Sequence, residues 1–218
     1  MIYKIISTGS KGNAVIYHDQ ILVDCGVPFV KLKPYIKEIK IVLLTHSHHD
    51  HFNPITIKKL ISDRPTLRFA CGQFLVERLH DLGAVKIDVV EPGKVYDYKL
   101  FKISPITLYH DVENYGYRIF KDDYKIIHAT DTVTMEGIRA KDYDLYAIEH
   151  NYDEMTIDQD IADKLSRNEY AYEIGAKNSH LSFQQAETFI EANRKETSEI
   201  LKLHISHKYD EIETKQGL

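Results

Sequence analysis

The feature that most constrains this chain is a run of ligand-type side chains directly after an apolar stretch. Residues 39–45 read Ile-Lys-Ile-Val-Leu-Leu-Thr, which predicts a mostly buried β-strand, and the next six residues read His-Ser-His-His-Asp-His. Imidazole nitrogens and carboxylate oxygens are groups that bind Zn²⁺ well. Because the loop after a strand can direct several side chains to one point, the segment predicts a metal centre at a strand end.

Length and composition are typical of one globular domain. The chain has 218 residues, of which 43% are hydrophobic and 28% charged, and no repeat or flexible linker divides it, so we expect a single domain over 1–218. It contains no apolar run of about 18 residues, which argues against a membrane span. Cys25 and Cys71 sit among apolar residues, and Met1 leads straight into a strand-like segment rather than a secretory leader. These features favour the reducing cytoplasm.

The charge balance limits the kind of partner. The formal net charge is −5, from 28 basic and 33 acidic residues, which argues against a broad basic surface for nucleic acid. A local positive site stays compatible with this balance, because bound metal ions would dominate the field around them. The sequence gives no indication of the oligomeric state.

The order of elements predicts an α/β (α+β) fold, a four-layer αββα sandwich of two mixed β-sheets flanked by helices. Between residues 85 and 127 the short segments and turns suit antiparallel strands. One helix is expected to begin at Asn53-Pro54, with Asn as its cap and Pro in its first turn. The other expected strands are 2–7, 14–18, 20–24, 39–45, 67–70, 144–148 and 200–204, and the other expected helices are 27–37, 72–82, 158–167 and 182–193.

The histidine run resembles the metallo-β-lactamase superfamily, whose hallmark is His-x-His-x-Asp-His. The resemblance continues in chain order through His110, Asp131 and His204, and it spans about residues 7 to 207. It implies a site for two Zn²⁺ ions. Mn²⁺ is the alternative, because the metal that a protein holds in the cell depends on availability as much as on affinity. The ligand set that it implies is His46, His48 and His110 for one ion, Asp50, His51 and His204 for the other, and Asp131 as the bridge.

Two further segments resemble particular branches of that superfamily. Residues 7–14, Ser-Thr-Gly-Ser-Lys-Gly-Asn-Ala, look like the Gly-Ser-x-Gly-Asn opening of the YycJ-like branch, which includes bacterial DNA exonucleases. From the residues alone, Gly9 and Gly12 suit either a tight turn or a phosphate-binding nest. The segment around His180, Asn-Ser-His-Leu-Ser, looks like ribonuclease Z and its small phosphodiesterase relatives. In those enzymes the matching histidine is a candidate proton donor, and Glu149 matches the acid that orients it.

The resemblance implies a two-metal hydrolase, most simply a phosphodiesterase or nuclease that acts on DNA or RNA through a metal-bound hydroxide, with His180, Glu149 and Asp50 as catalytic residues. The expected partner is therefore nucleic acid or a small phosphodiester. His110 and Asp131 are only 21 residues apart, which is too short for the tRNA-gripping arm of ribonuclease Z. The alternatives are a hydrolase of small, cyclic phosphodiesters or other esters, and a metal-binding protein without turnover. Lys208 is the expected contact to substrate phosphates.

Overall fold

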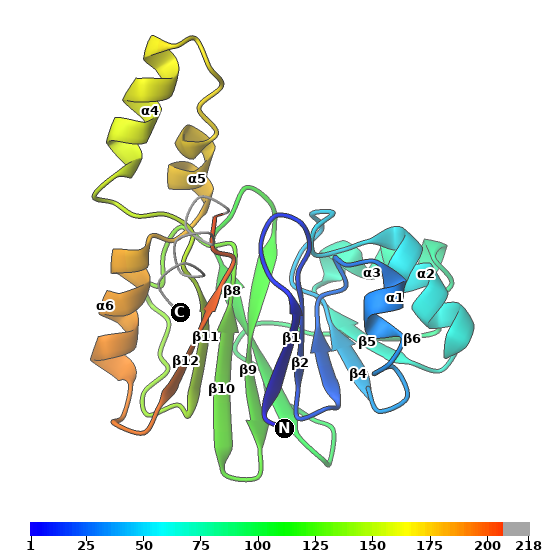
Figure 1. The fold of residues 1–218 in the computed structure, drawn as a ribbon. Coiled ribbons are helices and arrows are strands. Elements are labelled where there is room, and N and C mark those ends of the chain that lie inside the picture. The colour runs from blue at the N-terminus through cyan, green and yellow to red at the C-terminus, as the bar shows by residue number, and fades with distance from the viewer. Residues whose placement is uncertain (207–218) are drawn as a thin grey trace. The chain divides into compact units, whose positions relative to one another are not determined.

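The computed structural model describes residues 1–206, which fall into two compact units. The first unit consists of Met1–Lys94 and Val112–Tyr115, and the second of Val95–Asp111 and the chain from Gly116 on. Each unit contains one six-stranded sheet with its own helices (Figure 1). Both sheets contain parallel and antiparallel pairs, which confirms the predicted α/β class with two mixed sheets flanked by helices.

The sheet of the first unit runs in chain order, and its central strands are fully buried. The first three strands pair antiparallel, and β3 to β6 pair parallel. Every residue of β2, β3 and β4 is buried, as expected for strands covered on both faces. The strands are β1 (Tyr3–Ser7), β2 (Ala14–Tyr17), β3 (Ile21–Val23), β4 (Ile41–Leu43), β5 (Arg68–Cys71) and β6 (Lys86–Val89).

Helix α2 (Pro54–Asp63) begins as the sequence predicts. The Asn53 side chain accepts hydrogen bonds from the backbone N–H groups of Ile55 and Thr56, which the first turn of a helix otherwise leaves without partners. Pro54 fits at the first helical position because it has no N–H to satisfy. Ile57 and Leu60 join the apolar core of the unit.

Two helical predictions in the first unit need correction. The helix expected over 27–37 is only α1 (Phe29–Leu32), followed by a turn. Pro34 supplies the reason, because its ring removes a backbone donor and clashes with the preceding helical turn. The helix expected over 72–82 is a 3₁₀ turn, η1 (Gln73–Leu75), that leads into α3 (Val76–Asp81).

The sheet of the second unit places three parallel strands side by side. Strands β10, β11 and β12 pair parallel, whereas β7 with β8 and β9 with β10 pair antiparallel. The antiparallel arrangement predicted over 85–127 therefore holds from β7 on but is wrong for β6. The helix η1–α3 carries the chain from β5 to β6, and such a crossover gives a parallel pair. The strands are β7 (Tyr96–Asp97), β8 (Lys102–Leu108), β9 (Asn114–Lys121), β10 (Tyr124–Ala129), β11 (Leu145–Glu149) and β12 (Glu199–Leu203).

Three helices complete the second unit. Helix α6 (Phe183–Asn193) begins with a capping box between Ser182 and Gln185 and lies beside β11 (Figure 1). Helices α4 (Ile157–Ser166) and α5 (Glu173–Ser179) extend away from the sheet of this unit. The sequence did not predict α5, which has a glycine at its third position and ends in Asn-Ser. Within residues 1–206, no helix is long and apolar enough to cross a membrane.

The cap of α2 can be tested by substitution. We expect Asn53→Ala to lower the free energy of unfolding by about 1 kcal/mol, because two helical N–H groups lose their acceptor. Urea denaturation measures this change. Lys58→Ala, an exposed position on the same helix, serves as the control and should change stability by less than about 0.5 kcal/mol. Equal stability of the two variants would contradict a stabilising cap.

Candidate metal centre

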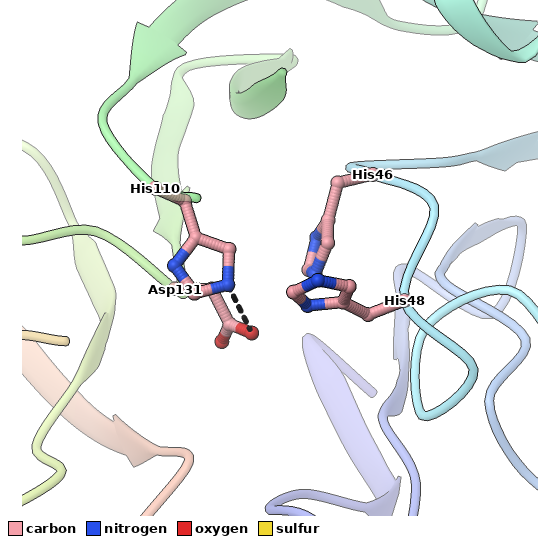
Figure 2. A group of neighbouring side chains, drawn as sticks. All are labelled: His46, His48, His110 and Asp131. Carbon is pink, nitrogen blue, oxygen red and sulfur yellow. Dashed lines mark ion pairs between the residues drawn. The ribbon is translucent and has the colours of Figure 1, made fainter. Parts of the chain in front are cut away.

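In the first unit, the loop that follows β4 gathers the four predicted ligands of the histidine run. His46 and His51 are completely buried, and the Asp50 side chain is partly exposed. The His46 ring lies 4.8 Å from the His48 ring and 4.2 Å from the His51 ring, measured between centroids. Figure 2 shows His46 and His48 extending from this loop. The strand end therefore directs imidazoles to one place, as the sequence predicts.

A buried carboxylate fixes the orientation of two of these imidazoles. Asp24 lies just after β3 and accepts hydrogen bonds from the backbone N–H of Thr45 at 2.9 Å, from its hydroxyl at 2.9 Å, and from Nδ1 of His51 at 2.6 Å. The Thr45 hydroxyl has one hydrogen, which it donates to Asp24, so it accepts from Nδ1 of His46 at 2.9 Å. Asp24 therefore orients His51 directly and His46 through Thr45.

These bonds also select the tautomer of each ring. With its proton on Nδ1, a neutral imidazole keeps the lone pair on Nε2, which is the form that binds a metal ion. Burial raises the pKa of Asp24, while the charge of His51 and the hydrogen bonds from His51 and Thr45 act in the opposite direction. These hydrogen bonds offset part of the cost of burying Asp24.

In the second unit, the ends of the strands bring the remaining predicted residues together. Asp131 follows β10, Glu149 ends β11 and His204 follows β12. Because these three strands are parallel neighbours, their carboxyl ends meet at one edge of the sheet. Ligand-type atoms of Asp131, Glu149, His180 and His204 all lie within 4.8 Å of one another.

Asp131 contacts one histidine with each of its carboxylate oxygens. Nε2 of His110 lies 3.8 Å from Oδ2, the ion pair drawn dashed in Figure 2, and Nε2 of His204 lies 3.6 Å from Oδ1. Nδ1 of His110 donates to the carbonyl of Ser179 at 2.7 Å, so this ring too keeps the lone pair on Nε2. Burial lowers the pKa of His110 despite the nearby carboxylates of Asp131 and Asp111, which favours the neutral imidazole.

Two side chains, an amide and a carboxylate, lie close to Nδ1 of His204. Nδ2 of Asn151 lies 3.0 Å from Nδ1 of His204, and Oε1 of Glu149 lies 3.5 Å from the same nitrogen. Binding of a metal ion through Nε2 requires the proton on Nδ1, for which Glu149 is the acceptor within reach. Asp131 and His204 both have a left-handed backbone, with φ of 56° and 50°, a strain that concentrates at functional sites.

Glu149 and His180 form a separate pair beside these ligands. Glu149 is completely buried, and its Oε2 accepts from the backbone N–H of Thr132 at 3.0 Å and of Leu181 at 3.3 Å. Its other oxygen, Oε1, lies 2.6 Å from Nδ1 of His180. The His180 side chain is 17% exposed, and its ring stacks on His204 with the centroids 5.0 Å apart. This geometry leaves His180 both oriented by a carboxylate and accessible.

The donor set of each unit fits a divalent cation such as Zn²⁺. The candidate ligands are imidazole nitrogens and carboxylate oxygens, without sulfur. In the rings of His46, His51 and His110, Nδ1 is engaged by a protein group, which orients Nε2 as the ligand atom. A neutral imidazole and an ionised carboxylate are also the protonation states that metal binding requires.

Sequence reasoning did not find the residues that support the ligands. Asp24 and Thr45 have no motif of their own, although an acid at the end of the apolar segment 20–24 was a usable signal. Asn13 was singled out only as part of a Gly-Ser-x-Gly-Asn segment, yet its side chain contacts both Asp50 and His51. Lys208, the expected phosphate contact, lies outside the described residues.

Comparison with known proteins identifies the family of the chain. Residues 19–205 match the family model described as "Beta-lactamase superfamily domain". No curated protein sequence matches the chain.

Among solved structures, the metallo-β-lactamase fold protein YhfI from Bacillus subtilis is 20% identical, with a TM-score of 0.73 over 94% of this chain and 86% of its own. The short form of human tRNase Z is 17% identical, with a TM-score of 0.69 over 95% and 94%. A diphosphatase from the PhnP family is 16% identical, with a TM-score of 0.67 over 99% and 90%. At these identities the likeness shows a shared fold.

The close packing beside the histidine loop can be tested at Gly26. A Cβ added there would lie 1.6 Å from the carbonyl oxygen of Asp50, a backbone overlap that no side-chain rotation relieves. We expect Gly26→Ala to cost about 4 kcal/mol or more in stability and to abolish metal binding. Thermal unfolding and metal analysis measure the two effects.

Gly175→Ala provides the control for this substitution. Its added Cβ meets nothing within 4 Å, and helix α5 should become slightly more stable. A Gly26→Ala protein with wild-type melting temperature and metal content would show that the close approach to Asp50 does not matter.

Proposed function

The chain belongs to the β-lactamase superfamily, and on that premise we propose that it is a two-metal phosphodiesterase or nuclease that acts on DNA or RNA. Members of the superfamily are mostly metal-dependent hydrolases, and the histidine and carboxylate groups described above suit divalent metal ions. The YycJ-like branch remains a prediction from the Gly-Ser-x-Gly-Asn segment.

The observation that carries the proposal is the pairing of His180 with Glu149. Oε1 of Glu149 lies 2.6 Å from Nδ1 of His180, and the His180 side chain is 17% exposed. An imidazole held in this way can donate a proton to a leaving oxygen. Cleavage of a phosphodiester produces an alkoxide that needs such a proton, so the pair suits this reaction.

The proposed ligand assignment follows the order of the family motif. His46, His48 and His110 would hold one ion and Asp50, His51 and His204 the other, with Asp131 shared. When bound, two divalent ions would polarise a phosphoryl oxygen and lower the pKa of a water molecule toward neutrality.

In this proposal the carboxylates and hydroxyl that support the histidines have separate roles. Asp24 and Thr45 hold the imidazoles of His51 and His46, while Glu149 holds His180. Glu149 stabilises positive charge on the His180 ring, so that Nε2 can carry the proton that the leaving oxygen takes. Asp50 serves as ligand and catalytic residue in this scheme.

Two of the structural relatives carry names that point to chemistry at phosphorus, a tRNase and a diphosphatase, which supports the proposed reaction class. A second candidate is a hydrolase of small phosphodiesters such as cyclic nucleotides. The net charge of −5 favours it, because a long strand of nucleic acid is usually bound along a basic surface.

A substrate panel tests the proposal and separates the two candidates. Protein loaded with Zn²⁺ or Mn²⁺ should hydrolyse at least one of single-stranded DNA, duplex ends, RNA and cyclic nucleotides, and a chelator should abolish the activity. Asp131→Ala should reduce turnover by more than about 100-fold, beyond the loss typical of groups that only support a ligand.

The control for this variant is Asp158→Ala, an exposed acid of the same unit that pairs with Lys177. It should retain wild-type activity, because a surface ion pair contributes little. Full activity in Asp131→Ala would place the reaction elsewhere, and metal binding without hydrolysis of any substrate would favour a protein without turnover.

The role of His180 can be isolated with two leaving groups. We expect His180→Ala to lose about 10²- to 10⁴-fold in rate when a sugar hydroxyl departs, because that oxygen needs a proton. Nitrophenolate leaves readily without one, so its release should be affected far less. Bound metal is measured in the same samples. Equal losses on both substrates with metal still bound would reject the proton-donor role.

A further inference from the structure

We propose that Asn13 is a positioning residue of the metal centre, which restrains the Asp50 carboxylate in the orientation that a bound ion needs. The inference deepens the proposed function and rests on it, because Asp50 and His51 are metal ligands only under that proposal. It concerns residues of the first unit alone.

The orientation of the Asn13 amide is fixed by the protein. Asn13 is 6% exposed, and its Oδ1 accepts a hydrogen bond from the backbone N–H of Gly9 at 2.8 Å. Because only the oxygen of an amide can accept from an N–H, Nδ2 takes the other position of the amide, from which it also donates to the Gly9 carbonyl at 3.1 Å. The donor end of Asn13 therefore faces the histidine loop.

Nδ2 of Asn13 lies against both candidate ligands. It is 2.8 Å from Nε2 of His51, 3.3 Å from Oδ2 of Asp50 and 3.3 Å from the Asp50 carbonyl oxygen. Nδ1 of His51 carries the proton that goes to Asp24, so Nε2 accepts from the Asn13 amide. The His51 ring is thus held at both nitrogens, and the Asp50 carboxylate is restrained by the same amide.

The backbone around Asn13 prevents the amide from moving away. The Asn13 N–H donates to the Asp50 carbonyl at 2.6 Å, and the Gly26 N–H donates to the Asn13 carbonyl at 2.9 Å. Gly12 has a φ of +137°, and a Cβ there would lie 2.4 Å from the carbonyl oxygen of Gly26. The loop that carries Asn13 is therefore tied directly to the segment that carries Asp50.

The neutral amide is the suitable group at this position. It supplies hydrogens to a carboxylate and to an imidazole nitrogen without adding charge beside Asp50. When Nε2 of His51 serves as a ligand, the amide hydrogens still have the oxygens of Asp50 and Gly9 as acceptors. Asn13 then restrains the Asp50 carboxylate, and removal of the amide should weaken the centre without removing a ligand.

The test is the Zn²⁺ affinity of Asn13→Ala, measured by competition with a chromogenic chelator. We expect the affinity to fall about 10- to 100-fold, the loss typical of groups that orient metal ligands. Asn53→Ala is the matched control, because it removes another asparagine that only stabilises the same unit. Its metal affinity should equal that of the wild type, although its stability is lower.

A second variant guards against failure of Asn13→Ala to fold. Asn13→Ser retains a hydroxyl oxygen but has a shorter side chain and no amide donor for His51, and it should show the same loss of affinity. If wild-type protein binds Zn²⁺ but a folded Asn13 variant binds it equally well, this inference is overturned alone. If wild-type protein binds no Zn²⁺ or Mn²⁺, the proposed function falls and this inference with it.

Discussion

The carboxylate of Asp24 is the group on which the arrangement of the histidine loop depends. It is buried at the end of β3, where a charge without donors would cost several kcal/mol. Its donors are the Thr45 backbone, the Thr45 hydroxyl and His51, so the loop must adopt the conformation that supplies them. The same bonds set the proton positions of the His46 and His51 rings. The hydrogen bonds of Asp24 therefore determine both the conformation of the loop and the protonated nitrogen of its two imidazoles.

In the second unit, Glu149 is likewise a buried carboxylate that binds a histidine. This acid also ends a buried strand, accepts two backbone N–H groups and binds Nδ1 of a histidine, His180. In each unit, then, a buried carboxylate orients an imidazole through its Nδ1. We infer different roles for the two rings, because His51 belongs to the family's ligand motif whereas His180 matches a proton donor. Asn13 adds a neutral support of the same kind from the opposite side of His51.

Much of this could be predicted from the sequence, for a physical reason. The ligand types are chemically distinctive and sit at the ends of apolar segments, so the strand ends and the α2 cap at Asn53 were found correctly. The supports were missed because Asp24 and Asn13 act through contacts between segments distant in the chain. Local errors have local causes: Pro34 stops a helix that spacing alone would continue, and α5 forms although its sequence favours helix weakly.

We propose that the histidine and carboxylate groups of this chain hold two divalent metal ions. X-ray absorption at the zinc edge of the Zn²⁺-loaded protein tests it most directly. We expect imidazole nitrogen and carboxylate oxygen ligands, no sulfur, and a metal–metal distance of about 3.5–4 Å. A spectrum with sulfur ligation from Cys25 or Cys71, or one without imidazole scattering at full loading, would contradict the account.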